Sequence, residues 1–351
     1  MKTIKQENQK VPDNQRLVII DGNAIIHRAY HAIPPLTAKG TMVNAVYGFT
    51  SMLLKVLADL KPTHLVVCFD VSGGTFRDDL YTDYKATRVK VDQDLYDQIP
   101  LVYEMVNAFN IPIYTKAGFE ADDVIGTIVQ KNKKTIKQKN KLDIIVVTGD
   151  MDLLQLVTDG VSVYELRKGL ADIVLFDAEK VKEKYGFGPE MVVDYKALRG
   201  DASDNIPGVP GVGEKTATEL ITKIGGIEKI YGQLEHATSP IYGIIKSGMI
   251  EKLKKGAESA RLSRVLATIR QDVPDISFQL KDAKAGAWDA EKIRTTFQKF
   301  EFFIIRYLQQ YITVYFLLLY IGGFTIIDIC NIQISIQGEL IFFIRKVSSR
   351  Y

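Results

Sequence analysis

Residues 17–21, Leu-Val-Ile-Ile-Asp, place four aliphatic side chains directly before an aspartate. The same arrangement returns in residues 65–70, Leu-Val-Val-Cys-Phe-Asp, and in residues 144–150, Ile-Ile-Val-Val-Thr-Gly-Asp. Apolar runs without alternation are typical of strands that are buried on both faces of a parallel sheet. Helical patterns over residues 43–60 and 98–109 separate the runs, as expected for crossover connections. The sequence therefore predicts an α/β fold with a mostly parallel sheet flanked by helices.

The composition is that of a folded protein with one large core or two domains. The chain has 351 residues, of which 46% are hydrophobic and 25% are charged, and this excludes a disordered or collagenous class. A net charge of +3 is too small to indicate nucleic acid or membrane by itself. The two cysteines, Cys68 and Cys330, lack the spacing of a disulfide framework or a zinc site. Residues 1–15 form a polar segment without the apolar core of a signal peptide, so we expect a loose tail and a cytoplasmic location.

Acidic residues follow each apolar run. They are Asp21, Asp70, and the pair Asp150 and Asp152. In open parallel sheets, the ligand crevice lies beyond the carboxyl ends of the strands, so these side chains should converge. One aspartate in such a place is equally typical of a turn or a helix cap. Because all three runs share the feature, convergence is the better explanation.

Two further segments carry paired acidic residues. Residues 120–123, Glu-Ala-Asp-Asp, precede a helical pattern, and residues 200–205, Gly-Asp-Ala-Ser-Asp-Asn, have two aspartates three positions apart. Alternative interpretations are first-turn acids favoured by the helix dipole and an ordinary polar turn. With the strand-end residues they make nine candidate metal ligands: Asp21, Asp70, Glu120, Asp122, Asp123, Asp150, Asp152, Asp201 and Asp204.

This candidate ligand set contains only oxygen donors. Like charges about 4 Å apart repel by roughly 1 kcal/mol even at the dielectric constant of water, so a cluster of this kind requires cations. Hard divalent ions such as Mg²⁺ or Mn²⁺ suit carboxylates better than zinc, which favours His or Cys. Pairs of such ions typically serve phosphoryl chemistry. We therefore expect two or more divalent ions.

Two other segments indicate a nucleic-acid substrate. Residues 206–217 combine a glycine-rich turn with a following helical pattern, as in a helix-hairpin-helix that holds phosphates through Gly208, Gly211, Gly213 and Lys215. Residues 72–90 interleave aromatic and basic side chains, which is the composition of a single-strand binding surface. A plain turn and a solvated loop are the respective alternatives.

These segments together resemble the 5′-nuclease domain of bacterial DNA polymerase I. The resemblance covers about residues 16–302, in the order of the family pattern, and rests on highly specific motifs: residues 21–23 (Asp-Gly-Asn), 75–77 (Thr-Phe-Arg), 84–88 (Tyr-Lys-Ala-Thr-Arg), 120–123, 148–152 (Thr-Gly-Asp-Met-Asp) and 200–208. It implies a PIN-like nuclease core over residues 16–195 with a helical arch over residues 72–100. It also implies a helix-hairpin-helix DNA-binding region over residues 196–302.

The resemblance implies a structure-specific 5′-to-3′ exonuclease and flap endonuclease of replication and repair, acting on DNA with a 5′ flap, a nick or a 5′ end. One metal ion would be held by Asp21, Asp70, Glu120 and Asp122, and a second by Asp150, Asp152 and Asp201. Asp123 and Asp204 match further acidic positions of the family pattern. Lys85, Arg88 and Arg77 would face the scissile phosphate, and Tyr84 would bind DNA. A K⁺ ion in the hairpin and a monomeric, nucleoid-associated protein are further expectations, and no protein partner is inferred.

Two other functions fit part of the pattern. A PIN-like ribonuclease would share the acidic cluster, although the duplex-binding hairpin argues against RNA as the substrate. A non-catalytic protein that binds DNA junctions would share the hairpin, although the complete carboxylate set argues against it.

Residues 303–351 differ from the rest of the chain. They are rich in Ile, Phe and Tyr, lack Ala and Pro, and carry no charge from Tyr307 to Ile327. One interpretation is a membrane span, and the other is a segment translated outside its original frame. The Gln and Gly residues inside the stretch favour the second interpretation. Because polymerase modules do not follow the nuclease pattern, we expect a free-standing nuclease or a truncated polymerase product.

Overall fold

The computed structural model describes residues 15–88, 92–137, 142–166, 173–236 and 238–302. The chain divides into two compact units, Met1–Phe300 and Glu301–Tyr351. The expectations for residues 1–14 and 303–351, a loose tail and a membrane span or out-of-frame segment, lie outside the described residues. Of the helices in the described ranges, none has the length and apolar character needed to cross a membrane.

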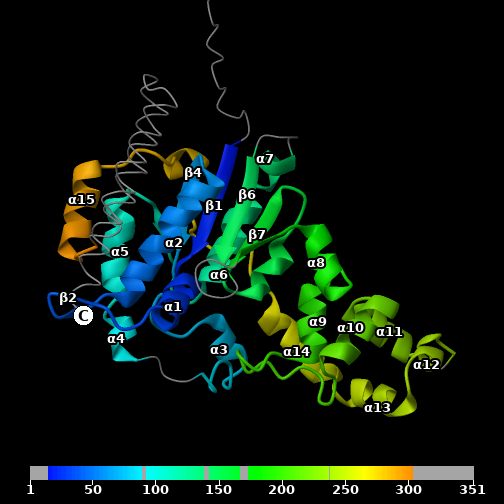
Figure 1. The fold of residues 1–351 in the computed structure, drawn as a ribbon. Coiled ribbons are helices and arrows are strands. Elements are labelled where there is room, and N and C mark those ends of the chain that lie inside the picture. The colour runs from blue at the N-terminus through cyan, green and yellow to red at the C-terminus, as the bar shows by residue number, and fades with distance from the viewer. Residues whose placement is uncertain (1–14, 89–91, 138–141, 167–172, 237, 303–351) are drawn as a thin grey trace, which may run out of the picture. The chain divides into compact units, whose positions relative to one another are not determined.

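A six-stranded sheet forms the centre of the first unit (Figure 1). Its order is β5-β4-β1-β6-β7-β8, and every neighbouring pair is parallel except β7 with β8. The three predicted runs are the three central strands, where Ile19 of β1 pairs with Val66 of β4 and with Val146 of β6. The strands are β1 (Gln15–Asp21), β4 (His64–Cys68), β5 (Ile113–Tyr114), β6 (Leu142–Thr148), β7 (Val161–Leu166) and β8 (Ile173–Phe176).

Helices cover the sheet because its central strands are apolar on both faces. The side chains of Leu17, Ile19 and Val66 share a core with α6 (Ala121–Lys131). In Figure 1, α1 (Gly22–Ala32) and α2 (Asn44–Leu60) lie in front of the sheet. The predicted helices at residues 43–60 and 98–109 are α2 and α5 (Ile99–Ala108). The α/β prediction is therefore confirmed.

Short elements connect these layers. They are β2 (Thr37–Ala38), β3 (Thr41–Met42), α3 (Phe76–Leu80), α4 (Gln93–Tyr96), α7 (Lys133–Lys137), η1 (Met151–Leu156), α8 (Ala178–Tyr185) and η2 (Pro189–Met191). Of these, α3 and α4 flank the undescribed residues 89–91 within the segment that the sequence predicts to be an arch.

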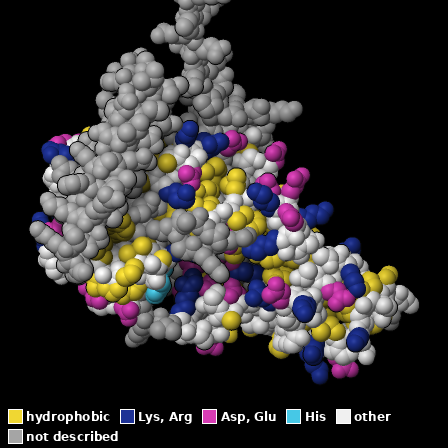
Figure 2. Space-filling view, viewed as in Figure 1, with side chains coloured by type: hydrophobic (Ala, Val, Ile, Leu, Met, Phe, Trp, Pro, Cys, Tyr) yellow, Lys and Arg dark blue, Asp and Glu magenta, His cyan; other side chains and the backbone are white. Residues whose placement is uncertain are grey.

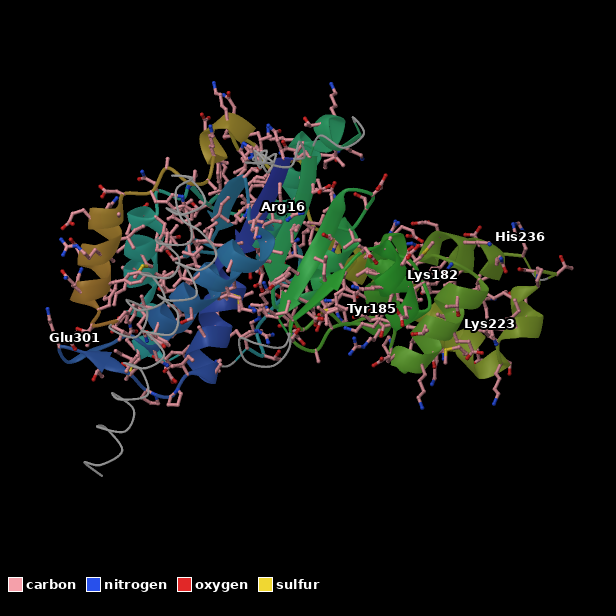
Figure 3. All side chains as sticks on the ribbon, turned by 45° about the horizontal axis from the view of Figure 1, so that its top comes forward. Arg16, Lys182, Tyr185, Lys223, His236 and Glu301 are labelled. Atoms are coloured by element: carbon pink, nitrogen blue, oxygen red, sulfur yellow. The ribbon has the colours of Figure 1, made fainter. Side chains whose placement is uncertain are left out.

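A group of helices follows the sheet on one side of the unit (Figure 1). In Figure 3, Lys223 of α10 and His236, which follows α11, lie away from the strands. The predicted helix after the glycine-rich turn is present as α10. The helices are α9 (Val192–Arg199), α10 (Glu214–Lys223), α11 (Ile227–Leu234), α12 (Ile241–Ile244), α13 (Ser247–Lys255) and α14 (Ala257–Ala267).

The chain then returns to the sheet through η3 (Leu280–Ala283) and α15 (Ala290–Lys299). Phe109, which follows α5, contacts Trp288 and Phe297 with ring centroids 5.3 and 6.2 Å apart. The backbone N–H of Ala285 donates to the carbonyl of Thr63, 2.9 Å away, just before β4. Residues 196–302 therefore include a final segment that belongs to the packing of the nuclease core.

Candidate active site and nucleic-acid interface

The carboxyl ends of three adjacent strands bring Asp21, Asp70 and Asp150 to one edge of the sheet. Asp21 ends β1, which lies between β4 and β6. One of its carboxylate oxygens accepts a hydrogen bond from the Ala24 N–H (3.0 Å) and the other accepts from the Thr148 hydroxyl (2.7 Å). The predicted convergence of strand-end carboxylates is therefore present in the structure.

Helix α6 adds two more carboxylates because it begins at the same edge. The backbone N–H of Ala121, its first residue, donates to Asp70 Oδ1 at 2.6 Å. Glu120 precedes the helix, and Asp122 lies in its first turn. A cavity of about 1290 Å³ is lined by five of the predicted ligands: Asp21, Asp70, Glu120, Asp122 and Asp150.

Burial and repulsion between carboxylates raise the pKa values of Asp21 and Asp122. Burial, followed by the charges of Asp70 and Asp150, raises the pKa of Asp21 to about 7. Burial and the neighbouring carboxylates, Asp21 foremost, also raise the pKa of Asp122. An unpaired buried charge is costly, so the fold alone does not stabilise the ionised form of this group.

The chemistry of the donors suits a hard divalent cation, because carboxylate oxygens of several strands and one helix meet with unbalanced charge. Within the described ranges, however, no three His, Cys, Asp or Glu side chains already form a complete metal-binding arrangement. The assignment of individual ligands therefore remains a prediction.

A second group of carboxylates is paired with a lysine that is not among the predicted site residues. The ammonium of Lys196, a residue only 8% exposed on α9, contacts Asp152 and lies 2.6 Å from Asp201 Oδ2. Although burial opposes the shift, the charge and hydrogen bond of Lys196 lower the pKa of Asp201 to about 2. The available signal in the sequence is a lysine five residues before Asp201, in a helical stretch that also carries Asp194 and Arg199.

The two arch cations lie at the same site. The ammonium of Lys85 pairs with Glu120, and its nitrogen is 3.8 Å from Asp204 Oδ2. A terminal nitrogen of Arg88 is 2.5 Å from Asp204 Oδ1. The structure thus brings both predicted cations to the carboxylates, whereas their role in catalysis stays a prediction.

Arg77 and Asp123 have a different place from the one that the sequence predicts. The Arg77 guanidinium is 2% exposed and donates to both Asp123 oxygens at 2.7 and 2.9 Å. It also donates to the carbonyls of Leu266 and Thr268, both at 2.9 Å. Asp123 is fully buried and accepts further hydrogen bonds from backbone N–H groups. These two side chains join α3, α6 and the end of α14, so neither is available to a phosphate or a metal ion.

Tyr84 and Gly208 are also buried. The Tyr84 ring is 5% exposed and packs with Ile206 and Leu266, while its hydroxyl lies 3.2 Å from both Glu120 Oε2 and Asp204 Oδ2. Tyr84 therefore anchors the arch segment and presents no surface for a base. Gly208 has a φ of 61°, and a Cβ there would lie 2.2 Å from the Gly200 nitrogen. The close approach of the backbone at Gly200 therefore requires a glycine at position 208.

Of the predicted hairpin residues, Gly211, Gly213 and Lys215 are exposed. Gly211 has a φ of 81°, a conformation that favours glycine. A Cβ on Gly211 would lie 2.8 Å from the ammonium nitrogen of Lys252, which places a basic side chain of α13 beside the turn. Lys252 is a second basic candidate that sequence order could not connect with the hairpin.

A second cavity, of about 810 Å³, adjoins the first. Tyr185, Tyr195, Arg199 and Lys196 line it, and it shares Ala24, His27, His31, Arg88 and Asp150 with the first cavity. Tyr185 lies where the sheet meets the helical group (Figure 3). In the space-filling view, Lys and Arg side chains gather with Asp and Glu side chains in a hollow (Figure 2). A continuous polymer could therefore contact both sides of the acidic group.

Family comparison agrees with this geometry. A family model described as 5′-3′ exonuclease, N-terminal resolvase-like domain, matches residues 16–186. A second, described as 5′-3′ exonuclease, C-terminal SAM fold, matches residues 187–291. The chain belongs to the 5′-3′ exonuclease family. The predictions of a nuclease and of an α/β core followed by a helical region are thereby confirmed at the level of family and fold.

Relatives of known sequence include two bacterial polymerases. DNA polymerase I of Bacillus caldotenax is 40% identical over 289 residues, and that of Caldicellulosiruptor bescii is 43% identical over 290 residues. Each match covers 82% of this chain but 32% of the polymerase, so the chain spans about a third of the length of these relatives.

Solved structures share the fold at lower identity. A bacteriophage T5 flap endonuclease in a complex with DNA and metal ions has a TM-score of 0.60 and 19% identity, and the match covers 82% of this chain and 100% of that one. The catalytic core of Rad2 with a DNA substrate has a TM-score of 0.52 and 17% identity, covering 82% of this chain and 88% of that one.

Proposed function

We propose that this 5′-3′ exonuclease family member hydrolyses phosphodiester bonds of DNA at junctions between single strand and duplex, releasing nucleotides or flaps from 5′ ends. The observation that carries the proposal is the pair of cavities that meet at Asp150 and Arg88, one beneath the arch segment and one beside the helical group. A junction has one unpaired arm and one paired arm, so it needs contacts on both sides of the cleavage point.

The unpaired arm is assigned to the cavity lined by Ser72, Gly73 and Lys85 of the arch segment. The duplex is assigned to the other side, where the exposed hairpin and Lys252 offer backbone N–H groups and cations to phosphates. Such contacts hold a duplex without reading its sequence. The T5 and Rad2 relatives, whose structures contain DNA, support this assignment.

Mg²⁺ or Mn²⁺ held by Asp21, Asp70, Glu120 and Asp122 would supply activation of water, and a second ion would stabilise the leaving oxygen. The second ion would use Asp150, Asp152 and Asp201. Lys196 occupies the space between Asp152 and Asp201 in the structure, so its ammonium must move aside or share them. Relatives whose structures contain metal ions support divalent metal use.

Lys85 and Arg88 are the residues that would neutralise the transferring phosphate. Both lie on the arch segment and line the first cavity together with the carboxylates. Preorganised cations aimed at charge that develops in a transition state are among the largest contributions to catalysis. To reach a phosphate, Lys85 must exchange its pairing with Glu120 for one with the substrate.

A labelled DNA with a 5′ flap tests the proposal when it is incubated with the full chain in Mg²⁺ or in EDTA. We expect a shortened labelled strand in Mg²⁺ alone. Absence of cleavage in both Mg²⁺ and Mn²⁺ would contradict the proposal. An RNA substrate of the same sequence and shape tests the ribonuclease alternative, which predicts faster cleavage of RNA than of DNA.

K⁺ in the hairpin, a monomeric state and a nucleoid-associated location belong to the proposal as well. Replacing K⁺ by Na⁺ at constant ionic strength should weaken duplex binding if the hairpin holds this ion. An unchanged dissociation constant would remove K⁺ from the assignment.

A further inference from the structure

Two tyrosines line the first cavity on the side formed by α4 and α5. Tyr96 ends α4 and is 52% exposed, and Tyr103 lies on α5 and is partly buried. Both line the same cavity as Asp70, Asp122 and the arch cations. Neither tyrosine is among the predicted metal ligands or cations. Metal binding and phosphate binding therefore do not account for two aromatic rings in this cavity.

Tyr103 is held in place by aromatic stacking. Its ring lies against Phe69, with centroids 4.4 Å apart and planes inclined by 23°. Phe69 is almost fully buried and directly precedes Asp70, a candidate ligand. The orientation of the Tyr103 ring is thus coupled to the strand end that carries the acidic group.

The cavity combines the three features that one nucleotide requires. Carboxylates form its acidic part, Lys85 and Arg88 supply cations for phosphates, and Tyr96 and Tyr103, with Ile99 and Pro100 beside them, supply aromatic and apolar surface. The uncharged faces of these rings do not neutralise a phosphate and do not coordinate a metal ion. Stacking of a nucleobase on an aromatic side chain tolerates any base, which suits a nuclease without sequence preference.

We propose that Tyr103 and Tyr96 form a binding surface for the nucleobase of an unpaired nucleotide adjoining the scissile phosphate. This inference rests on the proposed function, because it assigns the single-stranded arm to this cavity. The two rings would hold the base while the arch cations contact its phosphate. Removing the base from the DNA and removing the ring from the protein should then weaken binding through the same lost contact, so the two losses of affinity should not add.

The experiment combines protein variants with abasic DNA. The dissociation constant of the full chain for a 5′-flap DNA is measured in Ca²⁺ by fluorescence anisotropy. A single abasic residue is placed in turn at each of the first three unpaired nucleotides. The proteins are wild type, Tyr103→Leu, Tyr96→Leu and the conservative variant Tyr103→Phe, which keeps the ring.

We expect Tyr103→Leu to raise the dissociation constant of the intact flap about tenfold, and Tyr103→Phe to leave it within about twofold. At one of the three abasic positions, wild type and Tyr103→Leu should bind alike, because the base that the ring contacts is already absent. Tyr96→Leu should show the same pattern with a smaller effect. Since Tyr96 is largely exposed, its substitution should not disturb folding.

A purely structural role of Tyr103 predicts that the leucine variant loses the same factor on intact and on every abasic flap. That result, or unchanged binding by both leucine variants, would overturn the inference. Failure of the proposed function has a different signature, because wild type would then fail to cleave the intact flap in Mg²⁺.

Discussion

The candidate active site contains two groups of carboxylates that the fold treats differently. The first group, called here the strand-end group, combines Asp21 and Asp70 at the ends of β1 and β4 with Asp122 from the start of α6. Burial and then the neighbouring carboxylates raise the pKa values of Asp21 and Asp122. The loop group consists of Asp152, Asp201 and Asp204 and is paired with Lys196, Lys85 and Arg88. The loop group is thus neutralised by the chain itself, whereas the strand-end group is the one for which we propose a cation from solution.

Asp123 sharpens the contrast. It belongs to the same acidic segment as Asp122, yet both of its oxygens are used by Arg77 and by backbone N–H groups. Two adjacent aspartates on one helix therefore face opposite environments. Removing one partner of a buried pair such as Arg77–Asp123 typically costs about 3–5 kcal/mol, so substitutions there should act on folding before they act on chemistry.

The largest expected effect is that of Asp122→Asn. It should slow flap cleavage in Mg²⁺ by at least about 10²-fold, because it removes a charge from the group that needs the metal ion. In EDTA its melting temperature should equal or exceed that of wild type, since burial disfavours the charged form of Asp122 and the amide carries no charge. Asp201→Asn is the matched control, and it should lower the melting temperature in EDTA because Lys196 loses a partner. A lower melting temperature for Asp122→Asn would contradict the distinction between the groups.

Lys85→Ala tests the cation that links the two groups. The single-turnover rate of flap cleavage should fall by about 10²-fold, because a preorganised charge near the phosphate is lost. Lys55→Ala, which breaks the surface pair with Asp59 on α2, serves as the control and should cleave at the wild-type rate. If both variants kept that rate, Lys85 would not be part of the catalytic site.

The two groups should also respond oppositely to pH in metal-free protein. The pKa of Asp21 is raised from 3.8 to about 7, so folding favours its protonated form, and stability should fall as the pH rises from about 4 to 7. The pKa of Asp201 is lowered from 3.8 to about 2, so its contribution is present above about pH 4 and is lost as the pH falls to 2. Melting temperatures of wild type and Asp21→Asn in EDTA measure the first effect. The variant should show a flatter profile between pH 4 and 7, and parallel profiles would contradict the raised pKa.

The smallest expected effects belong to the hairpin, for which we propose contacts with phosphates. Gly211→Val should weaken duplex binding about tenfold, because valine is strained at this φ and its side chain would displace Lys252. A Cβ on Gly213 would meet no atom within 4 Å, so Gly213→Ala should weaken binding less than about threefold. Anisotropy measurements on a blunt duplex compare the two. Equal losses would show that the hairpin contacts DNA directly at Gly213.

Strand-end residues were predictable because one local rule governs them. An unalternating apolar run followed by an aspartate specifies both a buried parallel strand and the edge at which its acidic residue lies. The short strands β5 and β8 carry no comparable signal, since two or four residues do not establish a period. The sequence predicts the final segment around Trp288 as part of the helical region, because sequence order cannot show that Trp288 and Phe297 contact Phe109 at the end of α5.

The amino-acid sequence by itself determined the family, the α/β class and the set of acidic residues, because motifs and buried runs are local properties. Only the tertiary structure decided which charges are neutralised. It places Lys196 between Asp152 and Asp201, buries Arg77 against Asp123, and turns Tyr84 inward between Glu120 and Asp204. Such pairings join residues up to 120 positions apart. These pairings depend on distances and burial in the folded chain, and the order of the residues along the chain does not specify either quantity locally.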